Sequence, residues 1–313
     1  MTQPTAPRTI DLSNESIYAL AATALDQQIW FAACDTGLYR SLDQGATWQD
    51  CYAALATEEP LLTTALALSP DFARDRSVFT GGLGGVLRSL DGGDSWFVGL
   101  LPTPPPLVSA LAISPDFSHD GMLLAATMED GIFRSADRAA SWQSCNFGLL
   151  DLHVLALAIS PDFANDQTIF AGTESGIFRS TNGGRAWREL AFPEECAPVL
   201  SLALSPAYGE DGVAFAGTEA SGLFRTTDRG QTWGRIGESL TAAINTILIT
   251  RSSSGDVLLA LHDSALLCSR DRGQTWSACP HVAPDQEVVA ISTSEPLVIA
   301  SADGTTKGID LPS

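Results

Sequence analysis

Carboxylates are the side chains most able to do chemistry in this sequence, because Asp and Glu outnumber Lys and Arg by 37 to 17. One set of acids falls in short turns between apolar segments, and this set comprises Asp35, Glu129, Asp130, Glu174, Glu219, Asp263 and Asp303. If these turns share one face, their charges form a ring that attracts a cation or a basic protein surface. Repeated turn chemistry is the plainer interpretation, since Asp and Gly favour tight turns whether or not a ligand binds.

Cysteine and histidine give no pattern of a metal or nucleophilic site. Cys51, Cys145 and Cys279 each follow a tryptophan by three residues, where Leu190 and Ile236 stand in other repeats, so we interpret this position as core. The sequence contains neither a CxxC pair nor an HxxxH pattern, and metal sites need clustered ligands. We therefore predict no catalytic residue, no cofactor and no metal ligand.

The charge balance restricts the kind of partner. The formal net charge is −20 and Lys307 is the single lysine, whereas nucleic acids and anionic membranes require clusters of Lys and Arg. No apolar run approaches the roughly 18 residues of a membrane span. The first residues, MTQPTAPRTIDLSNES, lack the basic start and apolar stretch of a signal peptide. We expect a cytoplasmic protein; an extracytoplasmic location would require a signal removed ahead of Met1.

The elements that position these residues are repeated along the chain. An octamer recurs as SLDQGATW (41–48), SLDGGDSW (89–96), SADRAASW (135–142), STNGGRAW (180–187), TTDRGQTW (226–233) and SRDRGQTW (269–276). Each repeat holds four short β-rich segments separated by Gly, Asp and Asn turns; in the fourth they are 154–160, 168–173, 177–180 and 186–190. A four-stranded meander of about 45 residues is typical of a propeller blade.

The blade count depends on the two ends of the chain. Six octamers give six blades from about residue 16 to 280, while 287–311 reads as three strands and 8–12 as a fourth. We predict an all-β, seven-bladed β-propeller of four-stranded antiparallel blades, with residues 1–313 as a single domain. The N-terminal strand is expected to close the ring by completing the last blade, which protects exposed strand edges. Six blades with a C-terminal extension are the alternative.

The octamer resembles the Asp-box, or BNR repeat, of sialidase-like propellers, whose pattern is Ser/Thr-x-Asp-x-Gly-x-Thr-Trp. We expect its acid or amide to accept backbone N–H groups of its own turn, its Gly to supply a positive φ, and its Trp to anchor the hairpin. Ala139 is the exception at the glycine position. The resemblance implies that the boxes lie at the propeller's edge, as structural and not catalytic residues. These residues are Asp43, Trp48, Asp91, Trp96, Asp137, Trp142, Asn182, Trp187, Asp228, Trp233, Asp271 and Trp276.

The same resemblance raises the question of sugar hydrolysis. A sialidase-like site needs converging arginines, a Tyr nucleophile with a Glu partner, and an Asp acid. The Arg-Ile-Pro motif that usually precedes the first box is missing. Five arginines instead recur three residues before the box Asp or Asn, where we expect them to pair with neighbouring acids: Arg40, Arg88, Arg134, Arg179 and Arg225. Xyloglucanases, which also resemble this repeat, pair two propellers, and this chain has the length of one.

We therefore expect a non-enzymatic scaffold or recognition module, resembling the photosystem-assembly and other Asp-box propellers. Its partner is expected to be a protein, with a basic surface as the match for the seven turn acids, and the chain is expected to be a monomer. Apolar loops at 102–106, 147–153 and 191–198 are predicted on the same face. A sialidase- or xyloglucanase-like glycoside hydrolase is the alternative, which exposed aromatics and a carboxylate pair at the channel mouth would favour.

Overall fold

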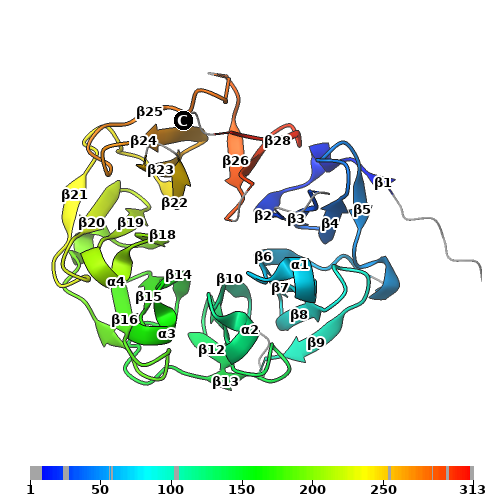
Figure 1. Ribbon diagram of the computed structural model, residues 1–313, viewed down its shortest axis with the longest axis horizontal. Helices are drawn as coiled ribbons and strands as arrows, with labels where there is room; N and C mark the ends of the chain where they lie inside the picture. The colour runs from blue at the N-terminus through cyan, green and yellow to red at the C-terminus, as the bar shows by residue number, and fades with distance from the viewer. Residues whose placement is uncertain are drawn as a thin grey trace, which may run out of the picture.

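Seven β-sheets are arranged as blades around a central axis in the computed structural model (Figure 1). The structure describes residues 9–23, 28–55, 57, 59–101, 106–252, 255–283, 285–293 and 296–310. The chain passes once around the ring, from blade 1 after the N-terminus to blade 7 at the C-terminus (Figure 1). The prediction of a seven-bladed propeller of antiparallel blades is confirmed, and the six-bladed alternative is wrong.

Each blade is built outwards from the axis in chain order. The innermost strands are β2 (Ile17–Ala22), β6 (Thr63–Leu68), β10 (Val108–Ile113), β14 (Val154–Ile159), β18 (Val199–Leu204), β22 (Ile244–Ser252) and β26 (Val288–Ile291). The second strands are β3 (Trp30–Cys34), β7 (Val78–Gly82), β11 (Leu123–Thr127), β15 (Ile169–Thr173), β19 (Ala214–Thr218), β23 (Gly255–His262) and β27 (Val298–Ser301).

The outer half of each blade is a hairpin that carries the octamer in its turn. The third strands are β4 (Leu38–Ser41), β8 (Gly85–Ser89), β12 (Ile132–Ser135), β16 (Ile177–Ser180), β20 (Leu223–Thr226), β24 (Ala265–Ser269) and β28 (Thr306–Gly308). The outer strands are β5 (Trp48–Asp50), β9 (Phe97–Leu100), β13 (Gln143–Ser144), β17 (Arg188–Glu189), β21 (Gly234–Ile236) and β25 (Ser277–Ala278). Blade 7, which has no octamer, has three described strands.

Short helical turns join the first and second strands of blades 2 to 5. They are α1 (Phe72–Asp75), α2 (Phe117–Asp120), α3 (Phe163–Asp166) and α4 (Tyr208–Asp211), and single 3₁₀ turns lie at Leu12–Asn14, Ala53–Leu55 and Glu194–Cys196. In α1 the Asp75 carboxylate accepts hydrogen bonds from the Ser69 hydroxyl at 2.6 Å and from the backbone N–H of Ser77 at 2.9 Å. Over the described residues, no helix is long and apolar enough to cross a membrane.

The hydrophobic core is divided among the junctions between blades. The described residues form seven buried clusters, and each cluster draws on two adjacent blades. The second strands are buried on both faces, as at Trp30–Cys34 and Ile169–Thr173, because a neighbouring blade covers each side. This explains why these strands read as continuous apolar runs without alternation.

The closure of the ring differs from the prediction. The N-terminal strand β1 (Thr9–Ile10) pairs antiparallel with β5 of blade 1, with Thr9 opposite Gln49 and Ile10 opposite Trp48. Residues 9–12 therefore do not complete blade 7, and the expected closure is wrong there; residues 8 and 311 lie outside the described part of the chain.

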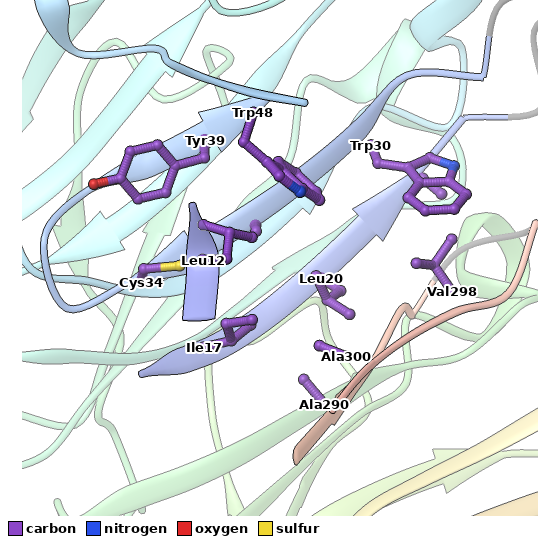
Figure 2. Packing of buried hydrophobic residues seen from close by; sticks show 12 residues of the cluster. Leu12, Ile17, Leu20, Trp30, Cys34, Tyr39, Trp48, Ala290, Val298 and Ala300 are labelled. Carbon is purple, nitrogen blue, oxygen red and sulfur yellow. The ribbon is translucent and has the colours of Figure 1, made fainter. Parts of the chain in front are cut away.

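Packing explains this position of β1. Leu12 lies two residues after β1 and is buried in one cluster with Trp30 of blade 1 and with Val298 and Ala300 of blade 7 (Figure 2). A Cβ built on Gly304 would lie 2.4 Å from the backbone of Ser13, so the turn after β27 approaches this segment closely. With Leu12 held at the junction, the residues before it run along the edge of β5.

Candidate functional site

The octamer turns show how the box residues act. In blade 5 the Asp228 carboxylate accepts the backbone N–H of Thr232 at 2.9 Å and its hydroxyl at 2.6 Å. The Thr226 hydroxyl donates to Asp228 at 2.7 Å and accepts the N–H of Gly230 at 2.9 Å. The prediction that the box acid binds its own turn is confirmed. Sequence reasoning missed the first Ser or Thr of the box, although its presence in all six octamers was a signal.

These hydrogen bonds favour the charged form of the carboxylates. Donation from Thr232 and Thr226 lowers the pKa of Asp228 to about 2, and donation from Thr275 and Ser269 lowers that of Asp271 to about 2. Such carboxylates stay ionised and committed to their turns.

The glycine and tryptophan positions also behave as expected, with one addition. The box glycines have positive φ, for example +85° at Gly230, and Ala139 keeps this conformation at +62°. The Trp96 indole donates to the carbonyl of Cys51 at 2.9 Å, and the Trp187 indole to that of Cys145 at 2.8 Å. In blades 2 and 4 the tryptophan therefore anchors its hairpin to the preceding blade, whereas the Trp276 indole donates to Gly273 of its own octamer at 3.0 Å.

The repeated arginines correct another prediction. Each donates to a backbone carbonyl in the octamer of the next blade: Arg40 to Gly92, Arg88 to Arg138, Arg134 to Gly183, Arg179 to Arg229, and Arg225 to Arg272. The accepting residue always has a positive φ. Only Arg40 among these five also has an ion pair given by the structure, with Asp94 at 2.8 Å. Pairing with acids is thus wrong as the general rule.

Blade 7 lacks this arginine contact on both sides. Cys268 stands at the arginine position of blade 6, the blade followed by one without an octamer. In blade 7 the arginine position is occupied by Gly308. Gly308 pairs with Val298 in this blade, just as Arg179 pairs with Phe170 in blade 4. The described part of the ring therefore has five arginine-linked junctions and two without them.

The seven turn acids lie at one end of the propeller. The residue after each second strand donates its N–H to the residue before the innermost strand: Glu174 to His153 at 3.2 Å, Glu219 to Pro198 at 3.1 Å, and Asp263 to Ala243 at 3.0 Å. These turns and the connections between blades therefore share a face, which we call the acidic face. Of the predicted apolar loops, residues 102–105 lie outside the described chain.

The aspartates of the acidic face shape their own turns. The Asp35 carboxylate accepts the N–H of Ser16 at 2.9 Å. Asp303 accepts the N–H of Thr305 at 3.0 Å and its hydroxyl at 2.6 Å, and these bonds lower the pKa of Asp303. Asp263 adopts a left-handed conformation with φ of +56°. For these residues the plainer interpretation, turn chemistry, describes what the side chain does.

The glutamates of this face are placed differently. Glu129, Glu174 and Glu219 are exposed and come from the adjacent blades 3, 4 and 5. The nearest charged partner that the structure gives for them is His153, whose Nδ1 lies 3.9 Å from the Glu174 carboxylate. Asp130 is half-buried, and its carbonyl accepts the Asn146 amide at 2.8 Å. The three glutamates are therefore the acids best placed to meet a partner.

A carboxylate pair that sequence reasoning missed lies at the start of blade 1. Partial burial, aided by a hydrogen bond with Asp35 and its charge, raises the pKa of Glu15, while donation from Thr36 opposes the shift. Tyr18, on the innermost strand nearby, is 51% exposed. Asp35 accepts the backbone N–H of Ser16, and Glu15 accepts the Thr36 hydroxyl. Both carboxylates therefore take part in the hydrogen bonds of their own turns.

The thiols and the metal-ligating side chains supply no reactive centre in the described part of the chain. Cys51 and Cys279 are buried, as predicted for a core position, and Cys145 is half-buried. Burial raises the pKa of Cys51 and of Cys145 to about 12, which keeps both thiols protonated and unreactive. Within the described residues, the structure contains no group of three or more His, Cys, Asp or Glu able to hold a metal ion.

Comparisons with solved structures support the fold. The chain is similar to the structure of YCF48 bound to D1 peptide, with a TM-score of 0.67 and 19% identity over 100% of this chain and 98% of that one. It is also similar to the GH74 xyloglucanase of Xanthomonas campestris, with a TM-score of 0.69 and 18% identity over 95% of this chain and 52% of that one. At these identities the likeness establishes the propeller fold alone.

A third similar structure is the extracellular domain of the putative one component system BT4673 of B. thetaiotaomicron. The TM-score is 0.68 with 14% identity, over 97% of this chain and 40% of that one. This chain thus spans about two fifths of the BT4673 domain and half of the xyloglucanase. No protein-family model and no curated protein matches the sequence. The similar propellers thus include a xyloglucanase, a protein solved with a bound peptide and the extracellular domain of a putative one component system.

Proposed function

We propose that this chain is a non-enzymatic recognition module that binds a basic protein surface on its acidic face. The observation that carries the proposal is the placement of Glu129, Glu174 and Glu219, which project exposed charge from three consecutive blades. Charges that surround one channel mouth add their potentials and steer an oppositely charged partner. The similar propeller YCF48 has been solved with a bound peptide, and this supports a protein as the class of ligand.

A glycoside hydrolase is the second candidate. The raised pKa of Glu15 favours it, because a protonated carboxyl is what a general acid requires, and Tyr18 offers an exposed ring nearby. The hydrogen bonds that Asp35 and Glu15 accept from Ser16 and Thr36 oppose it, because they engage both carboxylates in their own turns. Release of sugar from any member of a panel of glycosides, abolished by Glu15→Gln, would establish the hydrolase and displace the recognition module.

The test of the recognition module uses decalysine as a defined basic probe. A triple variant, Glu129→Gln, Glu174→Gln and Glu219→Gln, removes the exposed charge of the acidic face. A matched control, Asp116→Asn, Asp162→Asn and Glu210→Gln, makes the same change in net charge at the turns between the first and second strands of blades 3, 4 and 5, at the opposite end of the propeller. Calorimetric titration at low salt should show about a tenfold loss of affinity, or roughly 1.4 kcal/mol, for the first variant and little for the control.

Two outcomes would contradict the proposal. Equal losses in both triple variants would mean that decalysine responds to net charge and not to this face. Binding that does not weaken as salt rises would also be incompatible with exposed carboxylates, whose field is screened beyond about 8 Å at physiological ionic strength.

A further inference from the structure

The outer strand β9 (Phe97–Leu100) differs from the other outer strands of the propeller. It has four residues, against two or three in the others, and lies at the perimeter of the ring (Figure 1). Phe97 is 52% exposed, Val98 60% and Leu100 76%, and Leu83 in the adjacent turn is 71% exposed. We call these four residues the apolar strip.

The backbone of β9 directs the pairing groups of two residues away from its own blade. Leu101 donates to the carbonyl of Gly84 at 3.2 Å, and Gly85 lies opposite Leu100 in the register. Hydrogen-bonded and non-hydrogen-bonded pairs alternate along an antiparallel ladder, so the N–H and C=O groups of Val98 and Leu100 point away from β8. An apolar edge with unpaired backbone groups is a template for another strand.

The other outer edges are protected against such pairing. The edges of β13, β17 and β25 are two residues long, with the sequences Gln-Ser, Arg-Glu and Ser-Ala. Those of β21 and β28 are three residues long, and each carries a basic residue at its centre, Arg235 or Lys307. The edge of β5 is covered by β1, which pairs with Trp48 and Gln49. The pairing of β1 with β5 therefore shows that an outer edge of this propeller can accept an additional antiparallel strand.

Charge identifies the occupant of the β9 edge. Two copies that each carry a net charge of −20 repel one another, and the repulsion is weakest when they meet through uncharged surface. The turn of blade 2 at Leu83 is the one second-to-third-strand turn without an acid, and it adjoins β9. The uncharged sector of the acidic face thus lies beside the one apolar edge that the described residues leave uncovered.

We propose that β9 pairs with β9 of a second copy to form a symmetric dimer. With the two-fold axis at Gly99, Val98 lies opposite Leu100 of the partner subunit, and the outward groups of both residues complete an antiparallel ladder. Each chain has one such edge, so assembly stops at two. This departs from the monomer expected from the sequence, and it is independent of the recognition function because β9 carries none of the three glutamates proposed to bind the basic partner.

The test is the molar mass of the full chain in solution, measured by sedimentation over a wide concentration range. The mass of the wild type should rise to twice that of one chain, and added salt should strengthen the association, because it screens repulsion between acidic copies. This salt response is opposite to the one expected for decalysine binding. The amide protons of Val98 and Leu100 should exchange more slowly as the concentration rises.

Variants distinguish pairing at the β9 edge from nonspecific self-association. Val98→Lys with Leu100→Lys should remain monomeric at every concentration with unchanged melting, since both side chains are exposed in the single chain. Ser144→Lys, at the register-equivalent position in blade 3, should still dimerise. A wild type that stays monomeric at high concentration and high salt, or a double lysine variant that dimerises as well as the wild type, would overturn the proposal.

Discussion

Gly99 and Ala139 face each other across the junction of blades 2 and 3, and each replaces the residue type found at other junctions. A Cβ built on Gly99 would lie 3.0 Å from the carbonyl oxygen of Ala139. Elsewhere a larger residue meets a box glycine: a Cβ built on Gly93 would lie 3.3 Å from the Cys51 sulfur, and one on Gly230 would lie 2.8 Å from Leu190. The two exceptions therefore compensate each other in volume.

Transferring this pair to the junction of blades 1 and 2 is the first prediction. Gly93→Ala alone should lower the free energy of unfolding by about 1–2 kcal/mol, because alanine is forced into a left-handed conformation. Cys51→Gly should relieve the crowding, so the double variant should be more stable than the sum of the single effects by about 0.5–1 kcal/mol. Urea unfolding of the three variants measures this coupling. Strict additivity would mean that the two positions do not share their space.

The second prediction concerns the box of blade 4, where Asn182 stands with Ala186 in place of the acid and the hydroxyl. Asn182 accepts the N–H of Ala186 at 2.9 Å, and no hydroxyl requires a second carboxylate oxygen. Asp228→Asn should therefore cost about 0.5–1 kcal/mol, a value limited by exposure, because the Thr232 hydroxyl loses its acceptor. Adding Thr232→Ala should recover part of this loss. A larger loss in the double variant would show that the two residues act separately.

The third prediction is a loss of stability in acid. The folded pKa of Asp228 and Asp271 is about 2, below the ordinary value of 3.8, so folding favours their charged forms. The resulting stabilisation is fully present above pH 3.8 and is lost as pH falls from 3.8 to about 2. The melting midpoint should drop across this window, and Asp228→Asn should make the drop shallower. A flat profile between these two pH values would contradict the assignment.

The fourth prediction tests the junction of blades 7 and 1. Leu12→Ala should destabilise the fold by about 2–4 kcal/mol, since this side chain is 2% exposed in the cluster that blades 1 and 7 share. Leu42→Ala is the control, because Leu42 is 47% exposed in the neighbouring octamer and its loss should change little. Thermal unfolding compares the two. Similar midpoints for both variants would mean that the N-terminal segment does not hold the ring closed.

The fold was predictable because the residues of the octamer determine its local structure. A short acceptor, a glycine and a tryptophan at fixed offsets define one hairpin, and six copies imply a ring. The partners of the repeated arginines were not predictable, because the accepting carbonyl lies in the next blade and has no sequence signature. The pairing of β1 was missed for a related reason. The sequence shows that Leu12 is apolar, but it does not show whether Leu12 is buried between two blades or within one.

The candidate site was predictable in position but not in detail. Turn composition placed seven acids on one face, and the hydrogen bonds that enter the innermost strands support this placement. Whether a carboxylate is already hydrogen-bonded within the protein depends on backbone groups distant in the sequence. Asp35, for example, accepts the N–H of Ser16, 19 residues away in the sequence. Glu15 was missed because its raised pKa arises from burial and from proximity to Asp35, which only the fold brings about.

The arginine contacts also determine how the ring would respond to force. Arginine hydrogen bonds link blades 1 to 6 one to the next. The two junctions of blade 7 depend instead on apolar packing and on a parallel bridge between Leu20 and Ser292. A ring under tension parts at its weakest joint. When the protein is pulled by its two ends in an optical trap, blade 7 should detach first. The six blades linked by arginines should remain as an arc and unfold at higher force.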